Sequence, residues 1–457
     1  MAILLFQPDC ERTDMAPKVD PVASDESLPP RADVVIIGGG IIGVSTAFFL
    51  AEKGITVVLC EKGHIAGEQS SRNWGWCRKM ARDPREVPLI IESLRLWEGM
   101  NERVEAETGF RTCGIVYLFE SEAEAQRHEE WLDLARQYQL DTRMLSGAEA
   151  SGLLPGLGGK WAGALYTASD GRAEPQKAAP AIAEAARKKG AVILQNCAVR
   201  GIETAGGRVA AAVTEKGRIA CQSVVLAGGA WSRLFCGNNG IELPQLKVRA
   251  SVMRTTPLSG GPDISASGGL FAWRKRMDGG YTVATLGVRT IDLVPDHFRL
   301  FSEFMPAVRL HWKKLRFRVG GRFVEEWRMP RRWALDSPSP FEAVRVLDPE
   351  PDPFVVERAR STLAAAFPLF RGVEMAESWA GMIDVTPDAV PVISPVESLP
   401  GLVIATGFSG HGFGIGPGAG RLVADIVAGD PPVVDPAPFR FSRFTDGSRP
   451  MPSPIAS

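Results

Sequence analysis

The strongest chemical signal in the chain is the glycine-rich segment 38–43, GGGIIG. It follows an apolar run, Val34–Ile37, that predicts a buried strand, and it opens a helical pattern, Ile41–Lys53. Gly54 ends this pattern, and a second apolar strand is predicted at Ile55–Cys60. These segments form a β-α-β unit, whose crossover implies a parallel sheet.

Each glycine of this motif has a physical role in binding a dinucleotide. Gly38 permits a tight turn, Gly40 lets a pyrophosphate approach the backbone at the helix N-terminus, and Gly43 lets the helix pack closely on the strand. Glu61 ends the second strand, 18 residues after Gly43, where its carboxylate can bind both ribose hydroxyls of an adenosine and repel the 2′-phosphate of NADP. FAD and NAD both use this pattern, and the alternative is a turn that binds nothing.

A second glycine-rich segment, 407–420 (GFSGHGFGIGPGAG), favours FAD over NAD. It also leads from an apolar strand, 402–406, toward a predicted helix, Arg421–Ala428. Uncovered amides and a helix N-terminus carry partial positive charge, which suits the flavin edge where negative charge gathers on reduction. An NAD enzyme needs no such second site. The alternative is a tight turn in a compact sheet.

Composition excludes several classes of protein. The 457 residues carry 52 Lys and Arg against 53 Asp and Glu, which argues against a general nucleic-acid binder. Apolar content of 45% and charged content of 23% exclude wholesale disorder. The seven cysteines and five histidines are scattered, so we expect no disulfide framework, no metal site and a cytoplasmic location. Residues 34–51 are uncharged, but their three central glycines favour strand and turn over a membrane span.

The order of the predicted elements indicates the α/β class, with two domains interleaved along the chain. A Rossmann-like FAD-binding domain is combined with a mixed-sheet α+β substrate domain, which includes a hairpin that turns at Asp278-Gly279. The predicted ranges are 31–84, 165–245 and 374–440 for the FAD-binding domain, 85–164 and 246–373 for the substrate domain with an insertion at 291–355, and 1–30 and 445–457 for tails, the first of them disordered.

Six segments point to one family: ADVVIIGGGIIGVSTAFFLAEKG, GEQSSR, DGRAEP, NCAVRGIETAGGRV, VVLAGGAWS and GFSGHGFGIGPGAGRLVADIV. Through them the chain resembles, from about 32 to 444, the D-amino-acid-oxidase superfamily of FAD enzymes, and most closely its bacterial L-amino acid deaminases. The resemblance implies oxidation of an amino acid to an imine, which hydrolyses to a keto acid and ammonia, with no essential acid or base. The alternatives are a D-amino-acid or N-methylamine (sarcosine- or glycine-type) oxidase or dehydrogenase and, in another class, a non-catalytic FAD-binding subunit that passes electrons.

The resemblance also implies roles for individual residues. The FAD contacts are Gly38, Gly40, Ile42 and Gly43 at the pyrophosphate, Glu61 and Lys62 at the ribose, Gln69, Ser70 and Ser71 on the phosphate and ribityl side, Val199 at the adenine, Gly228, and Gly410, His411, Gly412 and Phe413 at the flavin pyrimidine edge. Arg274 matches the arginine with which such deaminases hold the substrate carboxylate, which a guanidinium can grip bidentately. The alternative is a solvated hairpin arginine, since its neighbours Lys275 and Arg276 are also basic.

Two departures from the deaminases concern the membrane and the pocket. Those enzymes carry an N-terminal transmembrane helix, whereas the corresponding stretch here is polar and broken by prolines, so we expect no such anchor. Trp74 and Trp76 stand where the deaminases have smaller or polar residues, and they are predicted to wall an apolar substrate pocket, with core packing as the alternative. Cys77 is expected to be buried and unreactive, not linked to the flavin.

The electron acceptor is oxygen or a quinone-type molecule, and two features favour the quinone. Sarcosine-type oxidases place a lysine over the flavin to activate oxygen, whereas the matching strand, 280–286, has none. Segment 309–332 holds nine Arg or Lys and two Glu, interleaved with aromatic residues, which suits contact with the inner face of a membrane. The alternative is an ordinary solvated face of the insertion.

Overall fold

The computed structural model describes residues 16–285, 289–312, 315–448 and 450–453. Its first sheet has six strands in the order β21-β22-β13-β1-β2-β9. Their bounds are β1 Val34–Ile37, β2 Val57–Cys60, β9 Val192–Leu194, β13 Ser223–Leu226, β21 Val392–Pro395 and β22 Leu402–Thr406. All neighbours are parallel except β21, which pairs antiparallel with β22. The predicted β-α-β unit and its parallel sheet are confirmed.

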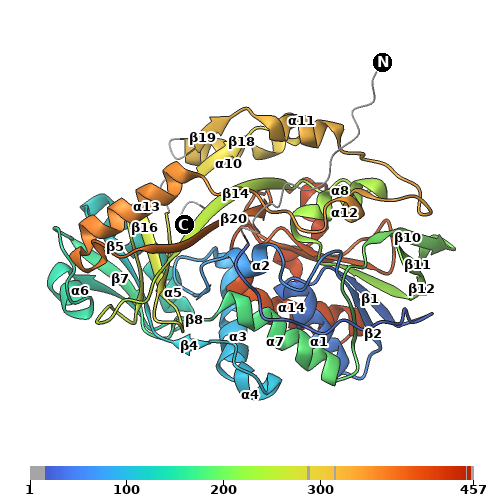
Figure 1. Ribbon diagram of the computed structural model, residues 1–457, viewed down its shortest axis with the longest axis horizontal. Coiled ribbons are helices and arrows are strands. Elements are labelled where there is room, and N and C mark those ends of the chain that lie inside the picture. The colour runs from blue at the N-terminus through green and yellow to red at the C-terminus, as the bar shows by residue number, and fades with distance from the viewer. Residues whose placement is uncertain (1–15, 286–288, 313–314, 449, 454–457) are drawn as a thin grey trace.

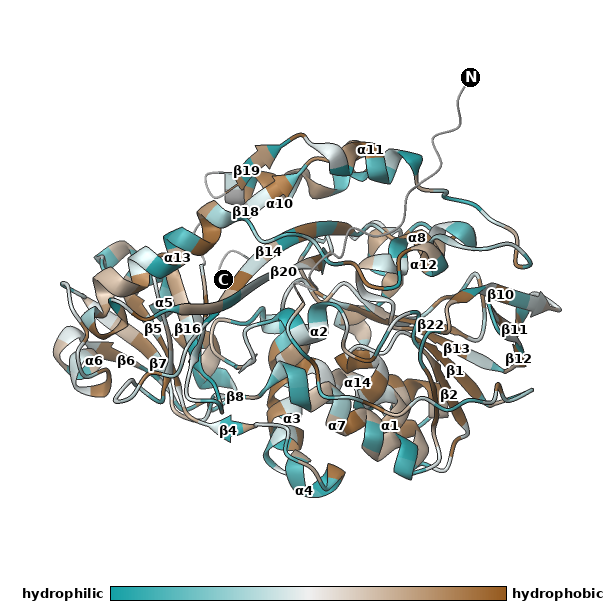
Figure 2. Ribbon diagram, viewed as in Figure 1, coloured by the Kyte–Doolittle hydropathy of each residue, from teal (hydrophilic) through white to brown (hydrophobic). Residues whose placement is uncertain are grey.

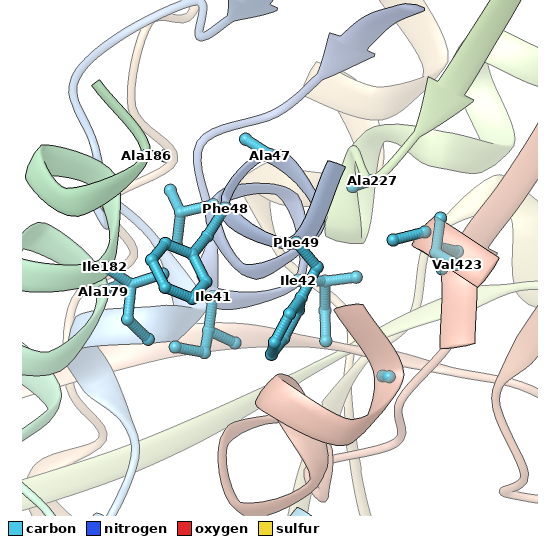
Figure 3. Packing of buried hydrophobic residues seen from close by; sticks show 14 of the residues in the cluster. Ile41, Ile42, Ala47, Phe48, Phe49, Ala179, Ile182, Ala186, Ala227 and Val423 are labelled. Carbon is cyan, nitrogen blue, oxygen red and sulfur yellow. The ribbon is translucent and has the colours of Figure 1, made fainter. Parts of the chain in front are cut away.

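One face of this sheet is covered by helices α1 (Ile41–Glu52), α7 (Pro175–Lys188) and α14 (Gly412–Ala428), and α3 (Val87–Glu98) packs on α14. Figure 3 shows α1 between α7 and α14, with Phe48 pointing toward α7. Helix α1 is apolar all round because it is buried on all sides. This packing places the N-termini of α1 and α14 beside the same sheet (Figure 1).

Helix α14 begins nine residues earlier than predicted, at Gly412 instead of Arg421. Glycine and proline have low helix propensity, so the sequence alone predicts a loop before Arg421. In the structure the glycines form the surface on which α1 packs: a Cβ on Gly416 would lie 2.6 Å from Ile41, and one on Gly420 2.4 Å from Ser45. Tertiary packing therefore overrides the local preference.

The other face of the first sheet carries an antiparallel meander and a short helix. They are β10 Val199–Ala205, β11 Arg208–Thr214, β12 Gly217–Ala220 and α8 Ser232–Asn238. Together with the sheet they form a second buried apolar cluster.

The second sheet has eight strands in the order β20-β14-β17-β16-β15-β5-β7-β6. Their bounds are β5 Ile115–Phe119, β6 Thr142–Ser146, β7 Gly163–Thr167, β14 Leu246–Thr255, β15 Ser265–Gly268, β16 Phe271–Lys275, β17 Tyr281–Ala284 and β20 Met375–Val385. The sheet is mixed because β15 and β5 are parallel, whereas all other neighbours are antiparallel. The α/β class with a mixed second sheet is confirmed, as is the hairpin at Asp278-Gly279 that joins β16 to β17.

The remaining elements cover or connect the two sheets. They are α2 Gln69–Arg72, β3 Trp76–Cys77, α4 Met100–Val104, β4 Arg111–Thr112, α5 Glu122–Gln137, α6 Gly147–Leu153, β8 Gly171–Arg172 and α13 Pro353–Ala366, and, in the predicted insertion, β18 Arg289–Asp292, α9 Pro295–Arg299, α10 Phe301–His311, β19 Leu315–Arg318, α11 Gly321–Arg328 and α12 Pro340–Ala343. In Figure 1, β18, α10, β19 and α11 form a layer at the top, above β14 and β20.

Two of the predicted ranges differ from the structure. Strand β20 lies within 374–440, assigned to the FAD-binding domain, yet it pairs along its length with β14 in the second sheet. Residues 16–30, assigned to the disordered tail, run along the protein because Asp25 binds Arg187 at 3.0 Å and the Ile193 amide at 2.8 Å. The rest of the two-domain division stays a prediction.

The described residues include no helix long and apolar enough to cross a membrane. Residues 34–51, whose lack of charge raised that question, form β1, the glycine turn and most of α1. Both elements are buried between other helices and strands of the protein.

Candidate active site

A cavity lies between the two sheets, at the carboxyl ends of β1, β2 and β13, where open α/β sheets bind their ligands. The predicted residues that line it are Gly38, Gly40, Ile42, Glu61, Lys62, Gln69, Ser70, Trp74, Trp76, Val199, Gly228, Gly410, His411, Gly412 and Phe413. Three predicted residues, Gly43, Ser71 and Arg274, lie outside this lining. Segments far apart in the sequence therefore meet around one cavity.

The glycines at the start of α1 have no room for side chains. A Cβ on Gly43 would lie 1.9 Å from the Gly38 carbonyl oxygen, and one on Gly38 would lie 2.4 Å from the Ala227 carbonyl oxygen. Gly38 also has a φ of 108°, which glycine adopts readily. The Ser70 hydroxyl oxygen accepts a hydrogen bond from the Ile41 amide at 2.8 Å. Gly43 thus acts by packing, and Gly38 and Gly40 open the backbone to the cavity.

Glu61 occupies the position expected for binding a ribose. Its two carboxylate oxygens accept hydrogen bonds from the Gly39 and Gly63 amides, each at 2.7 Å, which fixes the side chain at the cavity wall. Burial raises the pKa of Glu61 despite the neighbouring Lys62. The Lys62 ammonium itself lies 2.7 Å from Glu68 and 4.6 Å from the ring centre of Trp231.

At the other glycine-rich segment, the N-terminus of α14 faces the cavity through Gly412 and Phe413. No side chain caps this terminus and its first turn holds no acidic residue, so its amides keep their partial positive charge. The His411 ring lies 3.1 Å from the buried carboxylate of Glu86, and Arg82 donates to the His411 carbonyl oxygen at 3.4 Å. Burial lowers the pKa of His411.

Asp384, which the sequence did not identify, binds the start of the glycine-rich segment 407–420. Its carboxylate accepts hydrogen bonds from the Gly407 amide at 2.7 Å, the Thr406 hydroxyl at 3.0 Å and the Gln245 amide group at 3.2 Å. The Asp384 amide donates to the Gln69 side-chain oxygen at 3.3 Å, which links β20 to the start of α2. Asp384 is the penultimate residue of β20 and belongs to no motif, so no local signal marks it.

The third part of the cavity is aromatic and basic. The Trp74 and Trp76 rings meet edge to face with centres 5.4 Å apart, and Trp76 lies 5.9 Å from Tyr117. The Arg78 guanidinium lies 5.6 Å from the Tyr117 ring centre, and both residues line the cavity with Arg82. Both tryptophans therefore reach the cavity as predicted, whereas Tyr117 and the two arginines were missed because neighbouring residues alone do not mark them.

Arg274 is not brought to the cavity. Its side chain is 1% exposed, and Nη1 lies 2.6 Å from the Glu174 carboxylate. Its Nε donates to the Trp74 carbonyl oxygen at 2.6 Å and its Nη2 donates to Thr282 at 3.1 Å. The guanidinium is thus neither solvated nor open to a ligand.

Ser71 and Cys77, which lie in sequence close to the two tryptophans, are also buried. The Ser71 hydroxyl donates to the Glu68 carbonyl oxygen at 3.2 Å. Cys77 lies outside the cavity lining, and burial raises the pKa of its thiol well above the usual range, which keeps the sulfur protonated.

These features fit a long dinucleotide with a flavin at one end. Glycines without room for a Cβ, Glu61 and the uncapped N-terminus of α14 all border this one cavity. A comparison with known families agrees, because the model of the FAD dependent oxidoreductases (DAO) matches residues 33–426. The chain belongs to this family. FAD is therefore its cofactor.

Individual proteins of known structure or function support the assignment. The structure of L-amino acid deaminase from Proteus myxofaciens in complex with anthranilate is 38% identical, with a TM-score of 0.91 over 94% of this chain and 97% of that one. The β subunit of sarcosine oxidase from Rhodobacter capsulatus is 25% identical, over 91% of this chain and 89% of its own length. Glycine oxidase from Pseudomonas aeruginosa is 25% identical, over 89% of this chain and 97% of its own length.

Proposed function

We propose that the protein oxidises an amino acid at its Cα–N bond, in the manner of an L-amino acid deaminase. The observation that carries this proposal is the continuity of the cavity, which joins the dinucleotide end to a wall of aromatic and arginine side chains. The 38% identity to the Proteus myxofaciens deaminase, over nearly its whole length, supports the same activity.

In this reaction the amino acid loses its Cα hydride and one amine proton, and the imine takes up water to give a keto acid and ammonia. Bound FAD supplies the acceptor for the hydride. The chain binds and orients the substrate, and Trp74, Trp76 and Tyr117 cover the reacting end with apolar surface. The N-terminus of α14 provides positive potential where negative charge accumulates. No side chain need act as a base when the amine binds neutral.

A panel of substrates under anaerobic conditions tests the proposal. L-amino acids, D-amino acids and N-methylglycine are added separately to the FAD-loaded protein, and the loss of flavin absorbance is followed. We expect reduction by L-amino acids. Reduction only by the other substrates would contradict the assignment.

Two alternatives are tested by the same panel. A D-amino-acid or N-methylamine oxidoreductase is favoured by the sarcosine and glycine oxidase relatives and by a D-amino acid dehydrogenase that is 23% identical. A subunit that only passes electrons would be reduced by none of these compounds but would still accept electrons from dithionite.

We infer that the reduced protein passes its electrons to a quinone-type acceptor and reacts slowly with oxygen. Among the described residues, Lys62 is the only lysine that lines the cavity, and its ammonium is bound by Glu68 and by two carbonyl oxygens. Turnover in air is compared with turnover in the presence of a soluble quinone, with peroxide measured in parallel. Rapid, stoichiometric peroxide formation in air would show an oxidase instead.

We also propose that the insertion rests on the inner face of a membrane, close to such an acceptor. The support is an exposed aromatic and basic surface on α10, β19 and α11, in which Trp312, Phe317 and Trp327 are 63%, 51% and 67% exposed. In Figure 2 these elements carry hydrophobic and hydrophilic residues side by side.

A further inference from the structure

His411 and Glu86 form an acid–base pair at the cavity wall. The His411 ring lines the cavity with 19% of its side chain exposed, whereas Glu86 lies behind it, fully buried and outside the lining. Glu86 Oε2 lies 3.1 Å from His411 Nδ1 and 3.4 Å from Arg82 Nη1, and Oε1 has no hydrogen-bond partner among the described residues. A histidine held from behind by a carboxylate is oriented for proton transfer.

The charged groups around this ring favour its neutral form. They are Glu86, at the end of the 3-10 helix Pro84–Glu86, and Arg78 and Arg82 of the preceding loop, and the first turn of α14 adds no acidic residue. Burial lowers the pKa of His411, and Glu86 opposes this shift, whereas the two guanidinium groups add to it. Despite burial, the neighbouring ring and guanidinium groups lower the pKa of Glu86. The ionised carboxylate only accepts hydrogen bonds, so Nδ1 of His411 carries the hydrogen and Nε2 can take up a proton.

Reduction of FAD changes the charge beside this ring. His411 directly precedes α14, whose uncapped N-terminus faces the cavity and carries partial positive charge. The negative charge of a reduced flavin is stabilised best at this part of the wall. A negative charge there favours the protonated form of a neighbouring imidazole and so raises the pKa of His411.

We propose that His411, positioned by Glu86, takes up one proton when the bound FAD is reduced. The inference rests on the proposed amino-acid oxidation, which supplies this proton. The substrate gives its Cα hydride to FAD, and its ammonium group gives a proton to Nε2 of His411. A quinone then gains two electrons and a proton from the flavin and the second proton from His411, which returns to its neutral form as the quinol leaves.

The midpoint potential of the FAD-loaded full chain tests this without any substrate. It is measured with dithionite and indicator dyes between about pH 5 and pH 8, the range in which histidine titrates. Each proton that is taken up with two electrons makes the potential fall by about 30 mV per pH unit. We expect a fall of about 60 mV per pH unit over part of this range in wild type and about 30 mV throughout in His411→Gln, which can still donate to Glu86 but cannot be protonated.

Two further variants serve as comparisons, and FAD content confirms that each binds its cofactor. Glu86→Gln removes the charge that favours the protonated ring, so the steep part of the curve should move to lower pH. His64→Gln changes an exposed histidine outside the cavity lining and should match wild type. If His411→Gln loses FAD, the shift in Glu86→Gln decides.

Three results would overturn the inference. The first is a wild-type potential that falls by only about 30 mV per pH unit throughout. The second is a steep part that persists in His411→Gln or stays in place in Glu86→Gln, and the third is its loss in His64→Gln. A proton bound by the flavin itself would survive in His411→Gln and would change the absorbance of the reduced form with pH.

A pH-indicator dye follows the proton in the reaction itself. Anaerobic reduction by an L-amino acid in weak buffer should release no proton to solvent in wild type, because His411 keeps it, whereas His411→Gln should release it. Release by wild type would overturn the transfer to His411. Because the redox titration uses no amino acid, a failure of the proposed reaction would leave its result intact, and the two failures can be told apart.

Discussion

The guanidinium of Arg274 and the carboxylate of Glu174 lie 2.6 Å apart in a pair that is almost completely removed from solvent. Glu174 immediately precedes α7, which packs on the first sheet, whereas Arg274 lies in β16 of the second sheet. The same carboxylate accepts the Met277 amide at 2.8 Å, in the turn of the hairpin. The pair therefore joins the start of α7 to the second sheet and fixes the turn of the β16–β17 hairpin.

We predict that Arg274→Met destabilises the protein by about 3–5 kcal/mol, because it leaves the Glu174 carboxylate buried without its counter-ion. The double variant Arg274→Met/Glu174→Gln should recover part of this loss, since no buried charge remains unpaired. Urea unfolding of the two single variants and the double variant measures the coupling. A fully stable Arg274→Met protein with impaired substrate binding would instead support the role suggested by family resemblance.

Gly43→Ala should abolish FAD binding or weaken it by more than tenfold. The new methyl group would lie 1.9 Å from the Gly38 carbonyl oxygen, so α1 or the turn before it must move and the pyrophosphate site with it. Flavin content after purification and titration of the apoprotein with FAD measure the effect. Gly152→Ala, in a helix where a Cβ meets no atom within 4 Å, is the matched control and should retain FAD.

The predicted residues that the structure brings to the cavity lie mostly where strand, turn and helix follow one another in the chain. The segment 38–43, Glu61 and the end of β22 could be placed because local periodicity and glycine spacing determine them. Helix α14 shows the limit of this approach: its glycines disfavour a helix locally, and only contact with α1 explains why they form one.

Residues whose role depends on distant partners could not be predicted. Tyr117 and Asp384 lie in strands of the second sheet, and nothing in their own segments shows that these strands border the cavity. Arg274 could be found by resemblance, but its partner Glu174 lies 100 residues away in the sequence. The burial of such a pair depends on how the sheets meet, which local patterns do not contain.

Asp170 should make the stability of the protein depend on pH. Burial raises its pKa to about 6, although it accepts hydrogen bonds from the Lys79 and Met80 amides. Between about pH 4 and pH 6 the unfolded chain loses this proton while the folded protein keeps it, so stability falls as pH rises, by about 3 kcal/mol from this group. Below this window the carboxyl is protonated in both states.

Asp170→Asn removes this titration. As pH rises from 4 to 7, the free energy of unfolding of the variant should therefore increase by about 3 kcal/mol relative to that of wild type. Urea unfolding of both proteins across this range gives the difference, in which the other titrating groups largely cancel. If the two stability curves run parallel, burial does not hold the proton on Asp170.

The exposed surface of the insertion should bind anionic vesicles. Arg309 and Arg328 are exposed beside the aromatic residues of α10 and α11, and each cation near such a surface contributes about 1 kcal/mol. Arg309→Gln/Arg328→Gln should therefore weaken binding to phosphatidylglycerol vesicles by roughly 30-fold, measured by co-sedimentation. Added salt should weaken wild-type binding in the same direction, because it screens the charges.

The matched control for this surface is Arg127→Gln/Arg136→Gln, which removes two arginines of α5 that are 66% and 68% exposed, outside the insertion. If both double variants lose binding equally, the attraction depends on total charge and not on the insertion. Trp327→Ser tests the apolar contribution to vesicle binding. The Trp327 ring is 67% exposed and can enter the lipid interface, and salt does not screen this part of the binding. The variant should therefore lose the binding that wild type retains at high salt. Wild-type protein that binds neutral and anionic vesicles equally weakly would show that this aromatic and basic face is simply solvated.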